Sequence, residues 1–444
     1  MPVTPGPFAG RTVSDLALDL RAGRVTAAEL ARLALEAAAR LGPALNAFVT
    51  VDAEGALAAA RTADRELAEG ADRGPLHGIP VGVKDLIMVA GMPATMGSRH
   101  FAGYVPDADA ACVTRLRAAG AVIVGKTTTH EFAYGPTGDR SANGPSRNPW
   151  DPERMSGGSS GGSGAAVAAG IVPLALGTDT GGSVRIPAAL CGVAGFKPAY
   201  GAIRADGVFP LSVTLDHVGV LAGRAEDCLL AYACLADERP AQDVGEPVRT
   251  AWLDPAGLTP CDPRVAALAR EAAGAPDVVE LPEGVGARLR ETYTVIQSCE
   301  TAAVHAERLA GAPGLFDPEV LERLRVAAEV PGWRYVRAME ERRRLGGVVA
   351  ELFDGGHDVL ALPAVPLTAP PLQRREAVLD GGTVAVRAAL LALTSPWNVL
   401  GLPALTVPAG LVDGLPAGLQ LVCRPGGEHL LFQVAEKAGR SGPR

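Results

Sequence analysis

Two loops rich in glycine and serine carry residue types that acyl-transfer chemistry needs. Residues 157–164 read Gly-Gly-Ser-Ser-Gly-Gly-Ser-Gly, and residues 178–183 read Thr-Asp-Thr-Gly-Gly-Ser. Glycine allows backbone conformations and close approaches that other residues forbid. Successive backbone N–H groups in residues 180–183 could form an oxyanion hole around a carbonyl that Ser183 attacks. These loops are therefore where we expect a serine nucleophile.

A serine nucleophile needs a base, and Lys84 is the best candidate. It follows the apolar segment 79–83, which predicts a strand, and burial lowers the pKa of a lysine. A neighbouring hydroxyl would carry the proton between the lysine and the nucleophile. Each piece taken singly has an ordinary structural interpretation, because Gly/Ser loops are often turns or phosphate cradles and lone lysines are usually solvated.

Two other motifs compete with this interpretation. Residues 120–127 match the Walker A pattern, but Ala-Val-Ile-Val in its middle positions indicates a core strand instead of a phosphate loop. Residues 157–161 match Gly-x-Ser-x-Gly, the nucleophile elbow, which needs a strand directly before it. The preceding segment 148–152 is loop-like, and no histidine stands out as a base. We therefore expect neither nucleotide binding nor a nucleophile elbow.

In combination, these residues resemble the amidase signature family, whose members use a Ser–cis-Ser–Lys triad. The resemblance is close over about residues 76–220 and looser towards both ends. The matching motifs are Val-Lys-Asp at 83–85, the loops 157–163 and 177–187, Cys-Gly at 191–192, Lys-Pro at 197–198, Asp-His-Val-Gly at 216–219 and Gly-Leu-Pro-Ala at 401–404.

The resemblance implies a role for each site residue. Ser183 would be the nucleophile. Ser159, which follows a cis peptide bond from Gly158, would be the proton shuttle, and Lys84 would be the base. The remaining roles are oxyanion binding by the backbone amides of Thr180, Gly181, Gly182 and Ser183, support of the triad by Ser160, Asp179 and Arg185, and lining of the acyl pocket by Ala133 and Tyr134. No metal and no organic cofactor is implied.

Alternation of helix-like and strand-like segments predicts an α/β fold. The resemblance implies a large mixed central β-sheet with helices on both faces. We expect one amidase domain over residues 1–444, with a helical part at about 10–70, a signature core at about 76–220 and a C-terminal part at 221–444. The segment 237–254 is interpreted as a surface connection.

Several local patterns predict individual elements. Residues 26–29, Thr-Ala-Ala-Glu, form a capping box that opens a helix. The remaining expected elements are strands at 121–124, 359–362, 404–407 and 418–422, and helices at 112–119, 165–170 and 429–438.

Composition excludes several classes of protein. The formal net charge is −8 and aromatic residues make up 4%, which disfavours direct nucleic-acid binding. The start of the chain lacks a secretory signal pattern, and the apolar stretch 165–177 is too short to span a membrane. Seven scattered cysteines without a Cys-x-x-Cys pair predict reduced, buried thiols in a cytoplasmic protein.

The expected function is an amidohydrolase that cleaves a carboxylic amide through a Ser183 acyl-enzyme and releases ammonia or an amine. Its partner would be a small-molecule amide, and the sequence leaves homo-oligomerisation open. One alternative is the glutaminase-type A subunit of a tRNA-dependent amidotransferase. That branch has a longer C-terminal region with a glutamine-recognition segment, which is missing here, because residues 342–346 run directly to Phe353 and then to 358–370. Another is a catalytically silent binding subunit. Trp333, Tyr335 and Trp397 fit core packing better than the wall of an acyl pocket.

Overall fold

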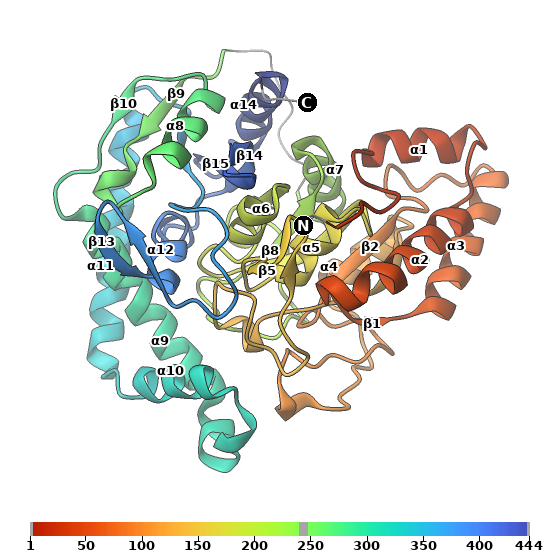
Figure 1. The fold of residues 1–444 in the computed structure, drawn as a ribbon, viewed down its shortest axis with the longest axis horizontal. Helices are drawn as coiled ribbons and strands as arrows, with labels where there is room; N and C mark the ends of the chain where they lie inside the picture. The colour runs from red at the N-terminus through yellow and green to blue at the C-terminus, as the bar shows by residue number, and fades with distance from the viewer. Residues whose placement is uncertain (1–2, 239–246, 442–444) are drawn as a thin grey trace.

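A computed structural model describes residues 3–238 and 247–441. A mixed sheet of 11 strands runs through this part of the molecule in the order β1-β3-β2-β6-β8-β7-β14-β15-β11-β9-β10 (Figure 1). Neighbours among β3, β2 and β6 run parallel, as do those among β11, β9 and β10, and all other neighbours are antiparallel. The predicted large mixed sheet is confirmed.

The described strands are β1 (Phe48–Val51), β2 (Pro80–Lys84), β3 (Val122–Thr127), β4 (Arg147–Asn148), β5 (Asp151–Met155), β6 (Leu174–Asp179), β7 (Ala194–Lys197), β8 (His217–Ala222), β9 (Thr250–Leu253), β10 (Val278–Val279), β11 (Val359–Pro363), β12 (Glu376–Leu379), β13 (Gly382–Ala385), β14 (Ala404–Val412) and β15 (Leu415–Cys423). The described α-helices are α1 (Val13–Arg21), α2 (Ala27–Leu45), α3 (Ala53–Ala68), α4 (Ala111–Ala118), α5 (Gly161–Ala168), α6 (Arg185–Cys191), α7 (Ala225–Leu235), α8 (Pro263–Ala272), α9 (Val285–Gly311), α10 (Pro318–Ala328), α11 (Gly332–Asp354), α12 (Val386–Ala392), α13 (Ser395–Val399) and α14 (Glu428–Ser441).

In β11, β14 and β15, alternate residues enter two hydrophobic clusters on opposite faces of that part of the sheet. In β11, Val359 and Ala361 join one cluster, whereas Leu360 and Leu362 join the other. The first cluster contains the apolar sides of α1, α2, α3, α7 and α14, and the second those of α9, α11, α12 and α13. Figure 1 shows α1–α3 towards the β1 end of the sheet, and α9 and α11 towards the end formed by β9 and β10. Helices therefore cover both faces, as side-chain alternation along a strand requires.

Capping boxes begin the first two helices. Thr26 accepts a hydrogen bond from the Glu29 amide, and the Glu29 carboxylate accepts one from the Thr26 amide. Thr12 and Asp15 form the same reciprocal pair at α1. Such pairs satisfy amide groups that have no partner inside the helix. The predicted helix start at residues 26–29 is confirmed.

The parallel pair β2 and β6 brings the predicted site residues to one edge of the sheet. Val83 lies opposite Leu176, so Lys84 at the end of β2 is next to the last residues of β6. The Gly/Ser loop runs directly into α5, and the loop after β6 runs into α6. In α/β proteins, binding and active sites usually lie at the carboxyl ends of parallel strands, next to the N-termini of the helices that follow.

Several predicted elements are present, and all of them except α4 extend beyond the predicted range. β3 continues through Gly125 and Lys126 to Thr127, which places the Walker-like motif inside a central strand. The strands predicted at 359–362, 404–407 and 418–422 are the cores of β11, β14 and β15, and the helices predicted at 112–119 and 429–438 are α4 and α14.

Other predictions require correction. Residues 148–152 are not simply a loop, because Asn148 pairs with Asp151 in the β4–β5 hairpin, whose polar residues hide the strand pattern. The helix predicted at 165–170 begins earlier, at Gly161, and ends at Ala168, because its first turn consists of glycine and serine residues that gave no helix pattern. The segment 237–254 contains β9, a strand of the central sheet, and residues 239–246 lie outside the described part. The N-terminal part, predicted to be helical, also contains the strand β1.

Side-chain burial corrects two further expectations. Four cysteines are buried, but Cys234, Cys261 and Cys299 are only half-buried, and all seven are free thiols. Trp333 is 58% exposed and does not pack in the core, whereas Trp397 is fully buried. Half-buried Tyr335 donates a hydrogen bond to Glu300.

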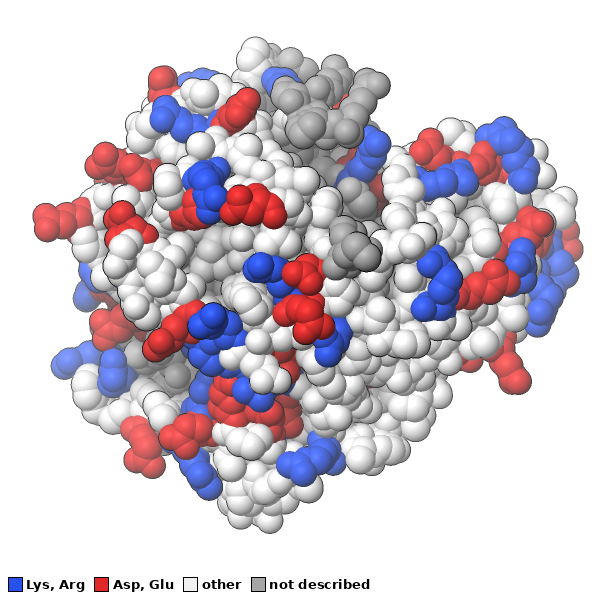
Figure 2. Space-filling view, in the orientation of Figure 1, with Lys and Arg blue, Asp and Glu red and all other residues white. Residues whose placement is uncertain are grey.

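Two properties of the described part bear on partners. None of its helices is both long and apolar enough to cross a membrane. On the face shown in Figure 2, Lys and Arg side chains are interspersed with Asp and Glu, and no continuous basic patch is visible.

Candidate active site

Lys84 lies at the centre of a buried polar cluster. Its side chain is completely inaccessible to solvent. The Lys84 Nζ lies 2.6 Å from Ser159 Oγ, 2.8 Å from Thr178 Oγ1 and 3.5 Å from the Thr178 carbonyl oxygen. β2 and β6 bring these groups together, because Lys84 ends one strand and Thr178 is the penultimate residue of the other.

Burial makes Lys84 a base near neutral pH. It lowers the pKa of the lysine to about 7, although the negative charges of Asp179 and Asp216 act in the opposite direction. Desolvation disfavours the ammonium form, while nearby carboxylates favour it. A substantial fraction of Lys84 is therefore neutral at pH 7, with a lone pair that can accept a proton.

Ser159 follows a cis peptide bond from Gly158. A Cβ atom at position 158 would meet the Gly138 nitrogen at 2.6 Å and the Gly135 carbonyl oxygen at 2.8 Å, so only glycine fits there. The Ser159 carbonyl accepts a hydrogen bond from the His130 amide at 3.1 Å. The segment 130–138 thus packs along the backbone that presents the Ser159 hydroxyl to Lys84.

Ser183 is held next to the same loop. The Ser160 amide donates a hydrogen bond of 3.1 Å to the Ser183 carbonyl, and Ser183 is 5% exposed. The Ser160 hydroxyl donates to the Thr178 carbonyl and accepts from the Thr178 amide, which joins the loop to β6. The structure therefore brings Lys84, Ser159 and Ser183 into one site at the sheet edge.

Asp179 and Arg185 organise the turn between β6 and α6. The Asp179 carboxylate accepts hydrogen bonds from the Gly182 and Val184 amides at 2.8 and 3.1 Å. The Arg185 guanidinium donates to both Asp179 oxygens, at 2.8 and 3.0 Å. Burial alone would raise the pKa of Asp179, but Arg185 holds it below its usual range. This charged pair sets the conformation of the loop that carries Ser183.

The predicted oxyanion residues lie on this turn and differ in their contacts. The Gly182 amide already donates to Asp179. The Gly181 carbonyl accepts a hydrogen bond of 2.6 Å from the Thr394 hydroxyl. The Thr180 hydroxyl donates to Asp216 at 2.6 Å, and burial raises the pKa of Asp216 to about 6. The backbone of residues 180–182 is therefore fixed from several sides.

Ala133 and Tyr134 lie across from this turn on a strained segment. Phe132 and Ala133 have φ values of 51° and 57°, which are uncommon for residues with a side chain. A strained backbone of this kind is kept only where the surrounding structure holds it in place, and it is often found at active or ligand-binding sites. Ala133 shares a narrow cavity with Thr178, Thr180 and Asp216.

Sequence reasoning missed several residues of the site. Thr178 carries a signal, because its hydroxyl lies within the Gly/Ser-rich segment 177–187, and Asp216 lies within a quoted motif. Asn398 and Gln420 have no local signal. Asn398 donates to Asp179 at 2.8 Å, and Gln420 Oε1 accepts from Arg185 at 2.7 Å. These partners come from the C-terminal part of the chain, more than 200 residues away.

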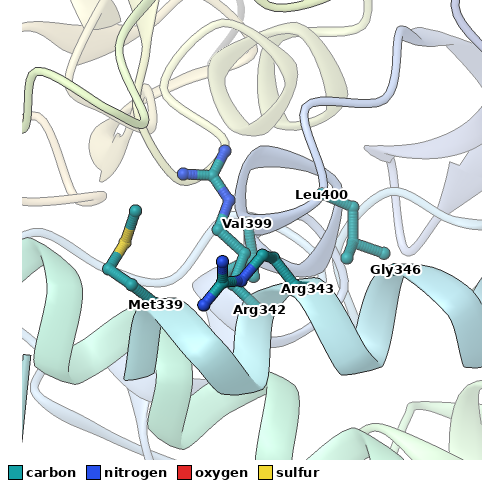
Figure 3. Close-up of a pocket in the computed structure, with 6 residues that line it drawn as sticks. All are labelled: Met339, Arg342, Arg343, Gly346, Val399 and Leu400. Carbon is teal, nitrogen blue, oxygen red and sulfur yellow. The ribbon is translucent and has the colours of Figure 1, made fainter. Parts of the chain in front are cut away.

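A second pocket opens on the outside of the molecule (Figure 3). It lies between α11 and the end of α13. Its lining residues are Met339, Arg342, Arg343, Gly346, Val399 and Leu400. None of the predicted site residues lines it.

Comparison with known proteins agrees with this geometry. The family model described as Amidase matches residues 29–307 and 313–432, nearly the whole chain. The chain belongs to the amidase family. It is therefore an amidase-signature enzyme that acts on amides, as the motifs predict.

Relatives of this amidase-family chain include proteins of different function. The A subunit of glutamyl-tRNA(Gln) amidotransferase from Roseiflexus sp. (strain RS-1) is 37% identical over 471 residues, covering 96% of this chain and 95% of that protein. A crystal structure of an amidase is 38% identical with a TM-score of 0.90, covering 97% of this chain and 99% of that one. A 6-aminohexanoate cyclic dimer hydrolase is 32% identical with a TM-score of 0.85, covering 98% and 97%.

Proposed function

We propose that the protein is an amidase that hydrolyses a small linear carboxamide through an acyl-enzyme on Ser183. The observation that carries the proposal is the buried contact of 2.6 Å between Lys84 Nζ and Ser159 Oγ. A lysine whose pKa lies at about 7 is suited to act as a general base at neutral pH. The backbone contact between Ser160 and Ser183 supports a relay from Ser183 through Ser159.

The proposed reaction has two halves. Neutral Lys84 accepts the proton of Ser159, which accepts the proton of Ser183 as Ser183 Oγ attacks the amide carbon. The proton returns through Ser159 to the leaving nitrogen, the C–N bond breaks, and ammonia or an amine departs. Water then attacks the acyl-enzyme through the same relay, which releases the carboxylic acid and restores the hydroxyl of Ser183.

Backbone amides on the turn after β6 would stabilise the negative charge of each tetrahedral intermediate. We assign this role to residues 180–183, as the sequence predicts. Because Asp179 already accepts a hydrogen bond from the Gly182 amide, Thr180, Gly181 and Ser183 are the donors that we expect to contribute most. Each such donor contributes roughly 10²–10³-fold in other acyl-transfer enzymes.

The test is ammonia release from a panel of small amides and glutamine, run with wild type and Ser183→Ala. Ser14→Ala, an exposed serine of α1, is the matched control. We expect the Ser183 variant to lose activity and to lose labelling by a fluorophosphonate, while the control keeps both. Substantial turnover by Ser183→Ala would overturn the nucleophile assignment. An unlabelled wild type without turnover would favour the silent binding subunit.

A second candidate is the glutamine-hydrolysing A subunit of a tRNA-dependent amidotransferase. The 37% identity to the Roseiflexus protein favours it. That alignment spans 471 positions, whereas this chain has 444 residues, so the relative contains residues that this chain lacks. Ammonia release from glutamine that appears only when the other proteins of such an amidotransferase are supplied would support this second function.

A further inference from the structure

The pocket between α11 and the end of α13 (Figure 3) lies outside the proposed active site and is large enough for a small molecule. Its volume is about 430 Å³, and small-molecule sites occupy roughly 300–1,000 Å³. We call it the outer pocket, and its lining residues are Met339, Arg342, Arg343, Gly346, Val399 and Leu400. The first four belong to α11, and the last two lie at the C-terminal end of α13.

Two arginines supply the polar part of this lining. Neither Arg342 nor Arg343 forms an ion pair within the described residues. Glu341, the acidic residue next to them, pairs with Arg288 and Arg344 instead. Arg342 is half-buried and donates one hydrogen bond, of 3.3 Å, and Arg343 is exposed. The positive charge on this side of the pocket is therefore available to an anion.

Glu300 does not neutralise this charge either. Its carboxylate acts on Arg342 by opposing the lowering of the arginine pKa that burial causes. It already accepts hydrogen bonds of 2.6–3.1 Å from the Ser212 hydroxyl, the Thr214 amide and hydroxyl, and the Tyr335 hydroxyl. A carboxylate offers about four lone-pair sites, so other groups of the protein already occupy those of Glu300.

The rest of the lining is apolar. Met339, Val399 and Leu400 form it, and Gly346 contributes no side chain. A Cβ atom at Gly346 would meet no other atom within 4 Å, so the helix surface is open at this point. Methionine adapts its shape to varied apolar partners. The outer pocket thus combines two cations with an apolar wall, which fits an anion that carries an apolar chain.

The helices around the outer pocket favour a carboxylate over a phosphate. Phosphates usually bind at helix N-termini, where free amide groups and the helix dipole attract negative charge. The outer pocket instead lies along the middle of α11 and at the C-terminal end of α13, where a helix leaves carbonyl groups without partners. A singly charged carboxylate suits this position better than a phosphate dianion, and guanidinium groups bind it through charge-assisted hydrogen bonds.

The α11 wall of the outer pocket is connected to the proposed active site. Arg342 donates its hydrogen bond to the Thr214 carbonyl. Thr214 belongs to the segment 211–216, whose two ends are tied together because Asp216 accepts hydrogen bonds from the amides of residues 211 and 212. Asp216 also accepts a hydrogen bond of 2.6 Å from the Thr180 hydroxyl. This segment therefore links the outer pocket to the turn that we assign to oxyanion binding.

The α13 wall has a connection of its own. Val399 and Leu400 directly follow Asn398, whose side-chain amide donates to the Asp179 carboxylate at 2.8 Å and to the Asp179 carbonyl at 2.9 Å. Asp179 in turn holds the loop that carries Ser183. A ligand in the outer pocket would touch both elements that support this loop.

We propose that the outer pocket binds a carboxylate with an apolar chain, and that the bound ligand slows the reaction at Ser183. The contact between Arg342 and the Thr214 carbonyl, at 3.3 Å, is longer than the usual N–H···O distance of about 2.9–3.0 Å. A carboxylate between Arg342 and Arg343 draws Arg342 away from Thr214 and releases the segment that holds Thr180. The binding site stands independently of the proposed function, whereas the effect on the rate rests on it.

Calorimetry with octanoate tests the binding site in the whole protein. We expect wild type to bind octanoate saturably. Acetate, which lacks the chain, and 1-octanol, which lacks the charge, should each bind at least about 10-fold more weakly, because each loses one of the two contributions. Octyl phosphate is the comparison anion, and tighter binding of octyl phosphate than of octanoate would contradict the assignment to a carboxylate.

Two glycines of α11 provide a matched pair of variants. At Gly346 and at Gly347 a Cβ would meet no atom within 4 Å, but only residue 346 lines the outer pocket. Gly346→Leu fills part of the pocket and should weaken octanoate binding by at least about 10-fold. Gly347→Leu should bind octanoate as wild type does.

Two neighbouring arginines provide a second pair. Arg343→Gln should weaken octanoate binding by roughly 10-fold, the effect of one lost charge-assisted hydrogen bond. Arg344→Gln removes an exposed arginine that does not line the outer pocket, and it should bind octanoate as wild type does. Octanoate binding that survives both Gly346→Leu and Arg343→Gln, or no binding at all, would overturn the inference even if every amide is inert.

The kinetic test measures how octanoate changes amide hydrolysis. We expect saturating octanoate to lower kcat by roughly 2- to 5-fold without a matching rise in KM, the effect of one weak hydrogen bond. This inhibition should disappear in Gly346→Leu and remain in Gly347→Leu. Purely competitive inhibition would place octanoate in the active site and overturn the inference. Amides that stay inert while octanoate binding responds to the variants would count against the proposed amidase function and support the outer site.

Discussion

Thr178 Oγ1 lies 2.8 Å from Lys84 Nζ, on the opposite strand of a parallel pair. A neutral amine has two N–H groups and one lone pair. The Thr178 hydroxyl and carbonyl, at 2.8 and 3.5 Å, can accept the two N–H groups. The lone pair is then directed to Ser159, 2.6 Å away. Thr178 is therefore a positioning residue for the proposed base.

Removing this hydroxyl should lower activity without loss of the fold. We expect Thr178→Val to reduce kcat by roughly 3- to 10-fold, the effect of one lost hydrogen bond. Thr178→Ser retains the hydroxyl and should stay close to wild type. The measurement is steady-state kinetics on the best amide, with circular dichroism as the check on folding. A Thr178→Val enzyme as fast as wild type would contradict the positioning role.

The rate should depend on pH through Lys84. Burial places the pKa of this lysine at about 7, and the protonated form has no lone pair to accept a proton. Activity should therefore fall about tenfold for each pH unit below the pKa and reach a plateau above it. Any residual activity of Lys84→Ala should lack this acidic limb. A flat profile from pH 8 to about pH 5 would exclude a neutral lysine base.

Arg185 should contribute strongly to stability. Its guanidinium and the Asp179 carboxylate are both fully buried, and they pair at 2.8 Å. Arg185→Met would leave the carboxylate uncompensated, so we expect a loss of about 3–5 kcal/mol in the free energy of unfolding. Arg11→Met, which breaks the partly exposed ion pair with Asp19, should lose at most about 1 kcal/mol. Denaturant titration compares the two, and equal losses would contradict the prediction.

Gly162 should tolerate no side chain. A Cβ at this position would meet the Thr128 nitrogen at 2.3 Å and the Ala47 carbonyl oxygen at 2.5 Å. Both atoms belong to backbone, so we expect Gly162→Ala to destabilise the fold by about 1–3 kcal/mol. Gly347→Ala, in α11 with no atom near its Cβ, should stabilise it by about 0.5–1 kcal/mol. Thermal unfolding of both variants checks the two opposite signs.

Local patterns predicted those elements whose determinants are close together in the chain. The capping box at Thr26 and Glu29 is one example, because a helix start depends on residues three positions apart. The predictions failed where pairing overrides local propensity. β5 was missed although its partner β4 is adjacent in the chain, because polar residues such as Asp151 give no strand pattern. β1 was missed because it lies in a helix-rich region and pairs with β3, a distant segment. A single sequence does not state which distant segment will supply such a partner.

The sequence by itself determined the family and the candidate triad, since the motifs around Lys84, Ser159 and Ser183 are contiguous and their residue types are required by the chemistry. Only the tertiary structure decided what surrounds them. Asn398 and Arg387 belong to segments without a motif, and long-range packing alone brings Asn398 to Asp179 and Arg387 to Tyr134. Local sequence can specify reactive groups, whereas the charge and shape of a pocket arise from contacts between residues far apart in the chain.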